Sequence, residues 1–167
     1  MRKTLALLTV VGLVLFGLAA PAGADSDARP FKATVVGAVS WTPDAECPPT
    51  LLSTDSAGVG NATHLGKMAM AREHCTPPGL DYGPGFMVLT APSGDELHFE
   101  YGGTCPPFMD LPIGDLLTCT VDWDVVGGTG RFADAQGSGG GYVSIVWEGL
   151  IVPTMDAWWT LEGTIGY

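Results

Sequence analysis

Basic residues are scarce in this sequence, and their scarcity excludes several kinds of partner. The 167 residues include 7 Lys and Arg against 18 Asp and Glu, which gives a formal net charge of −11 at pH 7. Arg2 and Lys3 lie at the N-terminus, so the chain beyond them carries about −13. A surface this acidic repels nucleic acid and anionic lipid headgroups. We therefore expect no nucleic-acid partner, whereas the charge favours solubility and cationic partners.

Long apolar runs are lacking as well, apart from one at the N-terminus. Residues 5–18 are almost wholly apolar, follow a basic start and precede Ala22-Gly23-Ala24, the small-x-small pattern that a signal peptidase cleaves. This run is shorter than a membrane span, and no second one follows. The pattern predicts a signal peptide at 1–24, one exported domain at 25–167 and no membrane insertion. The location would be secreted or periplasmic.

Cysteines with the spacing of a metal site are also missing. The four cysteines are Cys47, Cys75, Cys105 and Cys119, with no C-x-x-C and no nearby pair of histidines. Four cysteines in an exported domain are typical of two disulfides. Among three possible pairings we favour Cys105–Cys119, because each lies at the end of a strand-like run. Cys47–Cys75 then follows by elimination, and a zinc site is the alternative.

Stretches with the 3.6-residue period of a helix are scarce, although 68–73 alone fits one helical turn. Short segments alternate apolar and polar residues between clusters of turn residues, which is typical of strands. Loops are expected at 42–58 and 77–85, and a tight turn at 92–95. The predicted strands are 33–41, 61–74, 86–91, 96–104, 118–126, 141–150 and 155–165.

The alternation assigns side chains to two faces of each strand. Leu97, Phe99 and Tyr101 share one face, and the adjacent Trp158 and Trp159 point to opposite faces, so only one is interior. Antiparallel strands in sequence order leave two exposed edges, which closure removes. We predict an all-β fold, a single antiparallel up-and-down β-barrel of seven to eight strands stabilised by disulfides. An open two-sheet sandwich is the alternative.

Seven glycines gather at 125–141, and GTGRFA (128–133) fits the dinucleotide-binding pattern G-x-G-x-x-G/A. That pattern requires a helix after the strand, and only 131–136 is free of glycine before four more arrive. We interpret the stretch as a wide connection between strands, with glycines at positive φ and Phe132 plugging the end of the barrel. No cofactor is expected.

Several motifs resemble bacterial exported proteins with the allene oxide cyclase and dirigent-like β-barrel. They are GGTGRFADA (127–135) followed by GSG (137–139), GNATHLG (60–66), GDEL (94–97) and a closing EGTI (162–165). The resemblance spans about 33–167. It implies an eight-stranded barrel whose apolar cavity folds a reactive lipid epoxide or steers phenol radicals, or catalyses cycloaddition in certain bacterial relatives. No catalytic motif of that family matches this chain, so the catalytic residues are unknown.

Polar candidates are few. His98 lies between Glu96 and Glu100; if that face lines the barrel, His98 would favour its protonated form and act as an acid, and otherwise it is a surface residue. His64 lies in the GNATHLG motif, where a structural hydrogen bond is the favoured role, and His74 has no assigned role. Asp122, Asp124 and Asp134 lack the contiguous loop of a calcium site.

Large apolar side chains on the predicted strands fill the barrel core or line a ligand cavity. The candidates for cavity lining are Met68, Met70, Phe99, Tyr101, Trp123 and Trp159. Because no reactive constellation is present, we favour an exported barrel that binds a small apolar molecule or a protein partner without catalysis. The alternative, suggested by the resemblance alone, is a cyclase-like enzyme with a hydrophobic substrate.

Overall fold

The computed structural model describes residues 28–42, 47, 52–76, 81–108, 110–149 and 154–167. The predicted signal peptide at 1–24 lies outside the described residues. Within them, no helix has the length and hydropathy needed to cross a bilayer.

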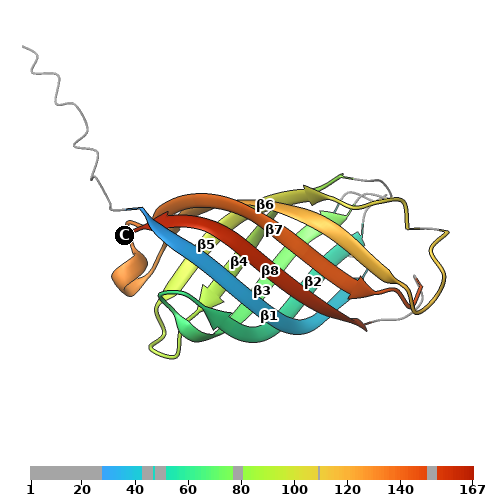
Figure 1. The fold of residues 1–167 in the computed structure, drawn as a ribbon, viewed down its shortest axis with the longest axis horizontal. Helices are drawn as coiled ribbons and strands as arrows, with labels where there is room; N and C mark the ends of the chain where they lie inside the picture. Colours follow the sequence, from blue (N-terminus) through green and yellow to red (C-terminus); the bar gives the residue numbers. More distant parts are fainter. Residues whose placement is uncertain (1–27, 43–46, 48–51, 77–80, 109, 150–153) are drawn as a thin grey trace, which may run out of the picture.

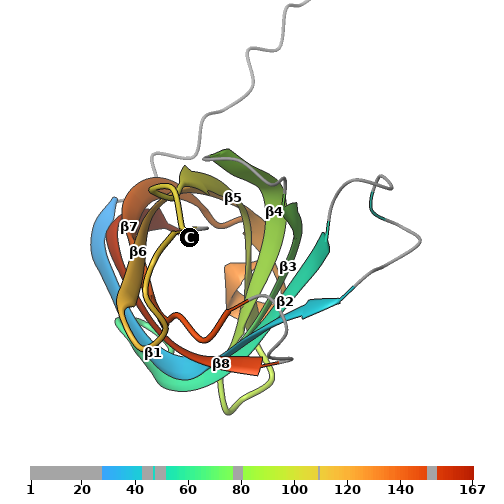
Figure 2. The same ribbon diagram turned by 90° about the vertical axis from the view of Figure 1, so that its right-hand side faces the viewer.

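Eight antiparallel strands form a closed barrel in sequence order, with the last strand paired to the first (Figures 1 and 2). The predicted up-and-down barrel is therefore confirmed, and the sandwich is not formed. A short 3-10 helix, η1 (Gly130–Phe132), covers one end. The strands are β1 (Arg29–Thr42), β2 (Leu52–Ala62), β3 (Gly66–Thr76), β4 (Asp81–Thr90), β5 (Glu96–Thr104), β6 (Leu116–Gly128), β7 (Gln136–Val146) and β8 (Thr154–Gly166).

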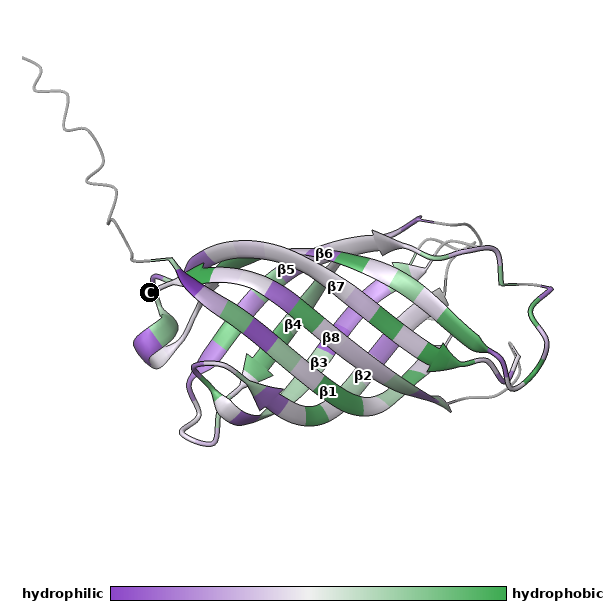
Figure 3. Ribbon diagram, in the orientation of Figure 1, coloured by the Kyte–Doolittle hydropathy of each residue, from purple (hydrophilic) through white to green (hydrophobic). Residues whose placement is uncertain are grey.

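Alternating hydropathy decides which side chains enter the barrel (Figure 3). Along β6, buried and exposed residues alternate over eleven successive positions, and Val121, Trp123 and Val125 point inward as predicted. In β8, Trp159 is interior, whereas Trp158 remains 41% exposed. Most strands thus contribute an apolar row to a single core inside the barrel, whereas the buried side chains of β2 include the polar Thr54 and Ser56.

The predicted loop at 42–58 is wrong in its second half, because β2 begins at Leu52. Glycines of β1 and β2 permit a close approach between these two strands rather than a turn. A Cβ on Gly60 would lie 1.9 Å from the Thr34 carbonyl oxygen, and one on Gly37 would lie 2.0 Å from that of Ala57. Small residues that resemble a loop in the sequence are therefore required where β1 and β2 pack.

The prediction of one strand at 61–74 is also wrong. The chain turns at 63–65, where His64 has φ 71° and Gly66 has φ 71°, so β2 and β3 form a hairpin. The predicted loop at 77–85 is wrong from Asp81 onward, since β4 begins there and contains a register shift between Tyr82 and Gly85. Residues 77–80 lie outside the described residues.

The glycine-rich stretch is a connection between strands, as predicted, but it is shorter than expected. It covers 129–135, and β7 begins at Gln136 rather than at 141. Gly130 has φ 57°, and Phe132 is fully buried against Tyr167, with ring centroids 4.8 Å apart. A Cβ on Gly139 would lie 2.4 Å from Trp123 Cζ2, so this glycine makes room for a core side chain.

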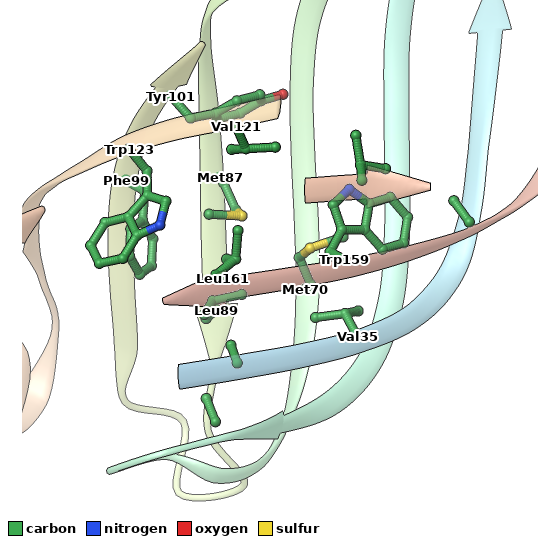
Figure 4. Packing of buried hydrophobic residues seen from close by; sticks show 14 of the residues in the cluster. Val35, Met70, Met87, Leu89, Phe99, Tyr101, Val121, Trp123, Trp159 and Leu161 are labelled. Carbon is green, nitrogen blue, oxygen red and sulfur yellow. The ribbon is translucent and has the colours of Figure 1, made fainter. Parts of the chain in front are cut away.

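The aromatic side chains of Phe99 and Trp123 pack together inside the barrel (Figure 4). The Trp123 ring lies 5.5 Å from Phe31 and 5.5 Å from Phe99 between centroids, both in edge-to-face contact. Such pairs are favourable beyond the area that they bury. This part of the interior is a packed core.

Both predicted disulfides are present. Cys47–Cys75 and Cys105–Cys119 have S–S distances of 2.07 and 2.00 Å, so all four sulfur atoms are paired rather than free to bind zinc. Disulfides persist in oxidising compartments. We call the end of the barrel that carries them the disulfide end, and the opposite one the η1 end.

Candidate functional site

Three aromatic side chains cover the interior at the disulfide end, and we call them the aromatic cap. Trp41 comes from the end of β1, Phe108 from the segment after β5 and Trp147 from the residue after β7. Their ring centroids are 5.1 to 6.0 Å apart in all three pairs. Because Phe108 and Trp147 lie outside the strands, the cap depends on segments less constrained than the barrel wall.

A cavity of about 30 Å³ lies beneath the aromatic cap. This volume exceeds that of a single water site, so the cavity has room for a small chemical group but not for a whole drug-sized ligand. Most of the lining is apolar, with a few polar groups from β2, β3 and β4. The lining residues are Val39, Trp41, Thr54, Arg72, His74, Thr76, Tyr82, Cys105, Phe108, Leu117, Cys119, Val143 and Ile145.

A chain of hydrogen bonds runs through the interior beside this cavity. Thr54 and Thr76 join through their hydroxyls, Thr76 Oγ1 lies 3.0 Å from His74 Nε2, and His74 Nδ1 lies 2.7 Å from the Tyr101 hydroxyl. The Tyr101 hydroxyl donates to the Glu73 carbonyl oxygen at 3.2 Å. With the Thr76 hydroxyl donating to Nε2 and Nδ1–H donating to Tyr101, every member has a partner.

His74 is uncharged within this chain. Burial, together with the positive charge of Arg72, lowers the pKa of His74 to about 3. Burial also raises the pKa of Tyr82 to about 12, and the Tyr82 hydroxyl donates to the Thr120 carbonyl oxygen at 2.6 Å. Burial likewise raises the pKa of Tyr101 above its ordinary value. All three side chains are therefore neutral near pH 7.

Arg72 is the unusual member of the interior because it is only 6% exposed. Its guanidinium carbon lies 4.8 Å from the ring centroid of Tyr101 and 5.6 Å from that of Trp159. No described carboxylate forms an ion pair with it. Arg72 Nε, Ser56 Oγ and Trp159 Nε1 are all buried, and none has a hydrogen-bond partner among the described residues.

The six side chains predicted to line a cavity are all buried inside the barrel, but none of them lines the 30 Å³ cavity. They are Met68, Met70, Phe99, Tyr101, Trp123 and Trp159. Phe99 and Trp123 fill the core toward the η1 end. Tyr101 and Trp159 lie beside Arg72 instead, and so belong to the polar part of the interior.

The two histidines predicted as polar-site candidates do not lie in this interior. His98 is half-buried on the outer face of β5, where Nε2 lies 2.9 Å from Glu96 Oε2. His64 makes a structural contact, with Nε2 3.1 Å from the Pro30 carbonyl oxygen. Its own carbonyl accepts a hydrogen bond from Arg131.

Sequence reasoning missed Arg72 and His74, although a signal for both was present. Met68 and Met70 were predicted to face inward, and a strand places every second residue on the same side. Continuing that row leads directly to Arg72 and His74. The residues themselves argued against this step, since arginine is almost never fully buried without a partner.

The outer face of β1–β4 carries two broad hollows of about 420 and 730 Å³. Small side chains such as Ala57 and Ala69 form their floor. Val36 is 57% and Val59 68% exposed beside them. Ser56 and Arg72 also contribute to the smaller hollow.

In the described ranges, no group of three or more His, Cys, Asp or Glu side chains lies close enough together to hold a metal ion. A scan against protein-family models found no match, and neither did searches of the curated proteins and of the solved structures.

Proposed function

We propose that this chain is an exported binding protein that takes up a small apolar molecule at the disulfide end without catalysis. The observation that carries the proposal is the cavity beneath the aromatic cap. Its lining is mainly apolar, with a few polar groups that converge from β2, β3 and β4. Ligand sites commonly combine these two properties.

The cavity accepts the end of a ligand, and the aromatic cap accommodates the rest. Phe108 lies outside the strand ladder, where the Leu111 N–H donates to the Phe108 carbonyl at 3.1 Å. Such a segment opens at a lower free energy than a strand does. A ligand that displaces Phe108 would pack against Trp41 and Trp147 in its place, and this packing offsets the cost of separating the Phe108 ring from the two indoles.

The protonation states favour binding over acid–base catalysis. A general acid or base works best with a pKa near the operating pH. The pKa of His74 is about 3 and that of Tyr82 about 12, so neither exchanges a proton readily near neutral pH. These groups serve to orient a ligand.

Export through a cleaved signal peptide at 1–24, with a secreted or periplasmic location, belongs to the same proposal. The two disulfides support it, because bonds of this kind persist outside a reducing cytoplasm. The motif resemblance supports a relationship to allene oxide cyclase and dirigent-like barrels, which share a strand order of this kind.

Titration with the neutral apolar probe N-phenyl-1-naphthylamine tests the proposal. We expect saturable binding of one probe per chain, with a change in the fluorescence of Trp41 and Trp147. Val143→Phe fills the cavity and should weaken binding by about tenfold or more. Its matched control, Val36→Phe on the outer face of β1, should leave binding unchanged. The proposal is contradicted if the wild-type chain shows no saturable binding, or if Val36→Phe abolishes binding and Val143→Phe does not.

The outer face of β1–β4 supports a second candidate, a protein partner. Val36 and Val59 are exposed beside the two hollows, and exposed apolar patches mark interaction sites. Analytical sedimentation tests this candidate. The wild-type chain and the Val59→Lys variant are each mixed with the other proteins exported by the same cells, and the sizes of the complexes are compared. A complex that Val59→Lys abolishes would place the partner on this face.

The cyclase-like alternative requires turnover, because binding alone does not accelerate a reaction. Incubation with a polyene or an epoxide and chromatography of the products tests it. A cyclised product that forms with the wild-type chain and not with Val143→Phe would establish catalysis at the same cavity.

A further inference from the structure

Arg72 is a buried cation without a compensating anion among the described residues. The neighbouring carboxylates on the same and the paired strand, Glu73 and Asp55, are exposed on the outer face. Across the barrel, Asp122 is likewise exposed. The groups that face Arg72 from inside are neutral, namely His74, Tyr82 and Tyr101.

The aromatic rings around Arg72 do not replace an anion. Contacts with the faces of Tyr101 and Trp159 attract the guanidinium, but burial of an unpaired charge is far more unfavourable than such contacts are favourable. Buried charges in proteins are therefore paired as a rule.

Two further donors lie beside the guanidinium without acceptors in the described part of the chain. Ser56 is the direct cross-strand neighbour of Arg72 in the β2–β3 pair, and both side chains point inward. Trp159 carries its unpaired Nε1–H on the ring that the guanidinium lies over. Arg72 Nε is the third unsatisfied group. Of these three residues only Arg72 lines the cavity, so an acceptor-only, negatively charged group in the cavity would compensate the guanidinium.

We infer that Arg72, which lines the cavity, binds the carboxylate group of the ligand, so that the apolar ligand of this barrel is a carboxylic acid in its ionised form. This inference rests on the proposed binding at the disulfide end and specifies its chemistry. A carboxylate has two oxygens in one plane, which match the planar fork of an arginine. A phosphate dianion fits less well, because only one cation is present among the lining residues and the cavity measures about 30 Å³.

A matched pair of probes, benzoate and benzamide, isolates the charge, because the two have nearly the same shape. We expect the wild-type chain to bind benzoate at least about tenfold more tightly than benzamide by calorimetry. In Arg72→Met the ratio of the benzoate and benzamide affinities should fall to about one, and the affinity for benzamide should be retained. Removal of an unpaired buried charge should leave the fold intact.

A second variant keeps the test decisive if Arg72→Met does not fold. Arg72→Gln removes the positive charge but keeps a polar side chain, and the ratio of the benzoate and benzamide affinities should again fall to about one. Trp123→Phe is the control, since Trp123 does not line the cavity and its Nε1 donates to the Gly140 carbonyl at 3.2 Å. An unchanged preference for benzoate in Arg72→Gln would overturn the inference.

Small anions test whether the site prefers a carboxylate to other anions. Acetate should raise the melting temperature at millimolar concentration, and chloride at the same ionic strength should not. An equal effect of chloride overturns the assignment to a carboxylate. Equal binding of benzoate and benzamide overturns it too, yet leaves the proposed function standing. Failure of benzoate, benzamide and N-phenyl-1-naphthylamine alike would reject the proposed function itself.

Discussion

The two ends of the barrel interior are built from the same strands but differ in chemistry. Toward the η1 end, Phe31, Phe99, Trp123 and Phe132 are essentially fully buried and contact one another or their aromatic neighbours. Toward the disulfide end, the interior holds a hydrogen-bonded chain and a cation, Arg72, that no described carboxylate pairs. Both disulfides lie at this second end.

The difference between the two ends has consequences for stability. Apolar burial stabilises the η1 end, whereas polar groups without partners make the disulfide end less favourable as a core. The cross-links offset that weakness, because each restricts the unfolded chain without filling the interior. A cavity and unsatisfied donors are thereby tolerated where the ligand is proposed to bind.

Truncating a tryptophan at each end gives the largest expected contrast. Trp123→Ala should lower the free energy of unfolding by about 3–5 kcal/mol, because it opens a cavity in a packed core. Trp41→Ala, at the partly buried member of the aromatic cap, should lower it by about 1–2 kcal/mol. Urea unfolding of both variants measures the difference. Equal losses would show that the disulfide end is packed as a core.

Removing either disulfide should destabilise the barrel somewhat less than the loss of Trp123 does. The paired cysteines are separated by 28 and 14 residues, and closing loops of these lengths contributes about 3 kcal/mol each in the chain-entropy model. Serine replacements of Cys105 and Cys119 together, followed by thermal unfolding, check this value. An unchanged melting temperature would mean that the polar end is stable without its cross-link.

Acidification should weaken the disulfide end through His74. Its pKa is lowered in the fold, so protonation favours the unfolded chain. Above pH 6.5, protonation of His74 does not reduce the free energy of unfolding. As the pH falls from 6.5 toward 3, this free energy decreases, and at pH 5 it is lower by about 2 kcal/mol. Unfolding of the wild type and of His74→Gln between pH 4 and 8 isolates it. Parallel pH profiles for the two proteins would exclude a buried neutral histidine.

The outer wall should be the least sensitive region. Val59 is 68% exposed on β2, so Val59→Thr should change the free energy of unfolding by no more than about 0.5 kcal/mol. Chemical denaturation measures this small change. A larger loss would show that Val59 is covered in the exported protein, as a partner on the outer face of β1–β4 requires.

Most of the fold could be predicted from alternation, and the failures have a physical cause. The strand 96–104 was located to the residue, since its apolar and polar positions alternate cleanly. β2 was missed, because Gly58 and Gly60 suit a loop as well as a strand that packs closely on β1. The close approach of two strands is set by the closed barrel, so it produces no local pattern in the amino-acid sequence.

The site was less predictable than the fold. The inward direction of Met68 and Met70 was evident from their spacing, but that of Arg72 conflicts with the usual exposure of arginine. His98 attracted attention because acids flank it in the sequence, yet these neighbours share the outer face with it. The unpaired donors became visible only when β2, β3 and β8 were placed together, since one comes from each strand.

The five tryptophans allow one direct measurement of the claim that ligand binds at the disulfide end. Trp41 and Trp147 lie in the aromatic cap, Trp159 beside Arg72, Trp123 toward the η1 end and Trp158 on the outer wall. Their indole N–H signals resolve separately in a nitrogen–proton NMR spectrum during titration with benzoate. We predict shifts for Trp41, Trp147 and Trp159, and unchanged signals for Trp123 and Trp158. Shifts confined to Trp123 or Trp158 would contradict the assignment of the disulfide end as the binding site.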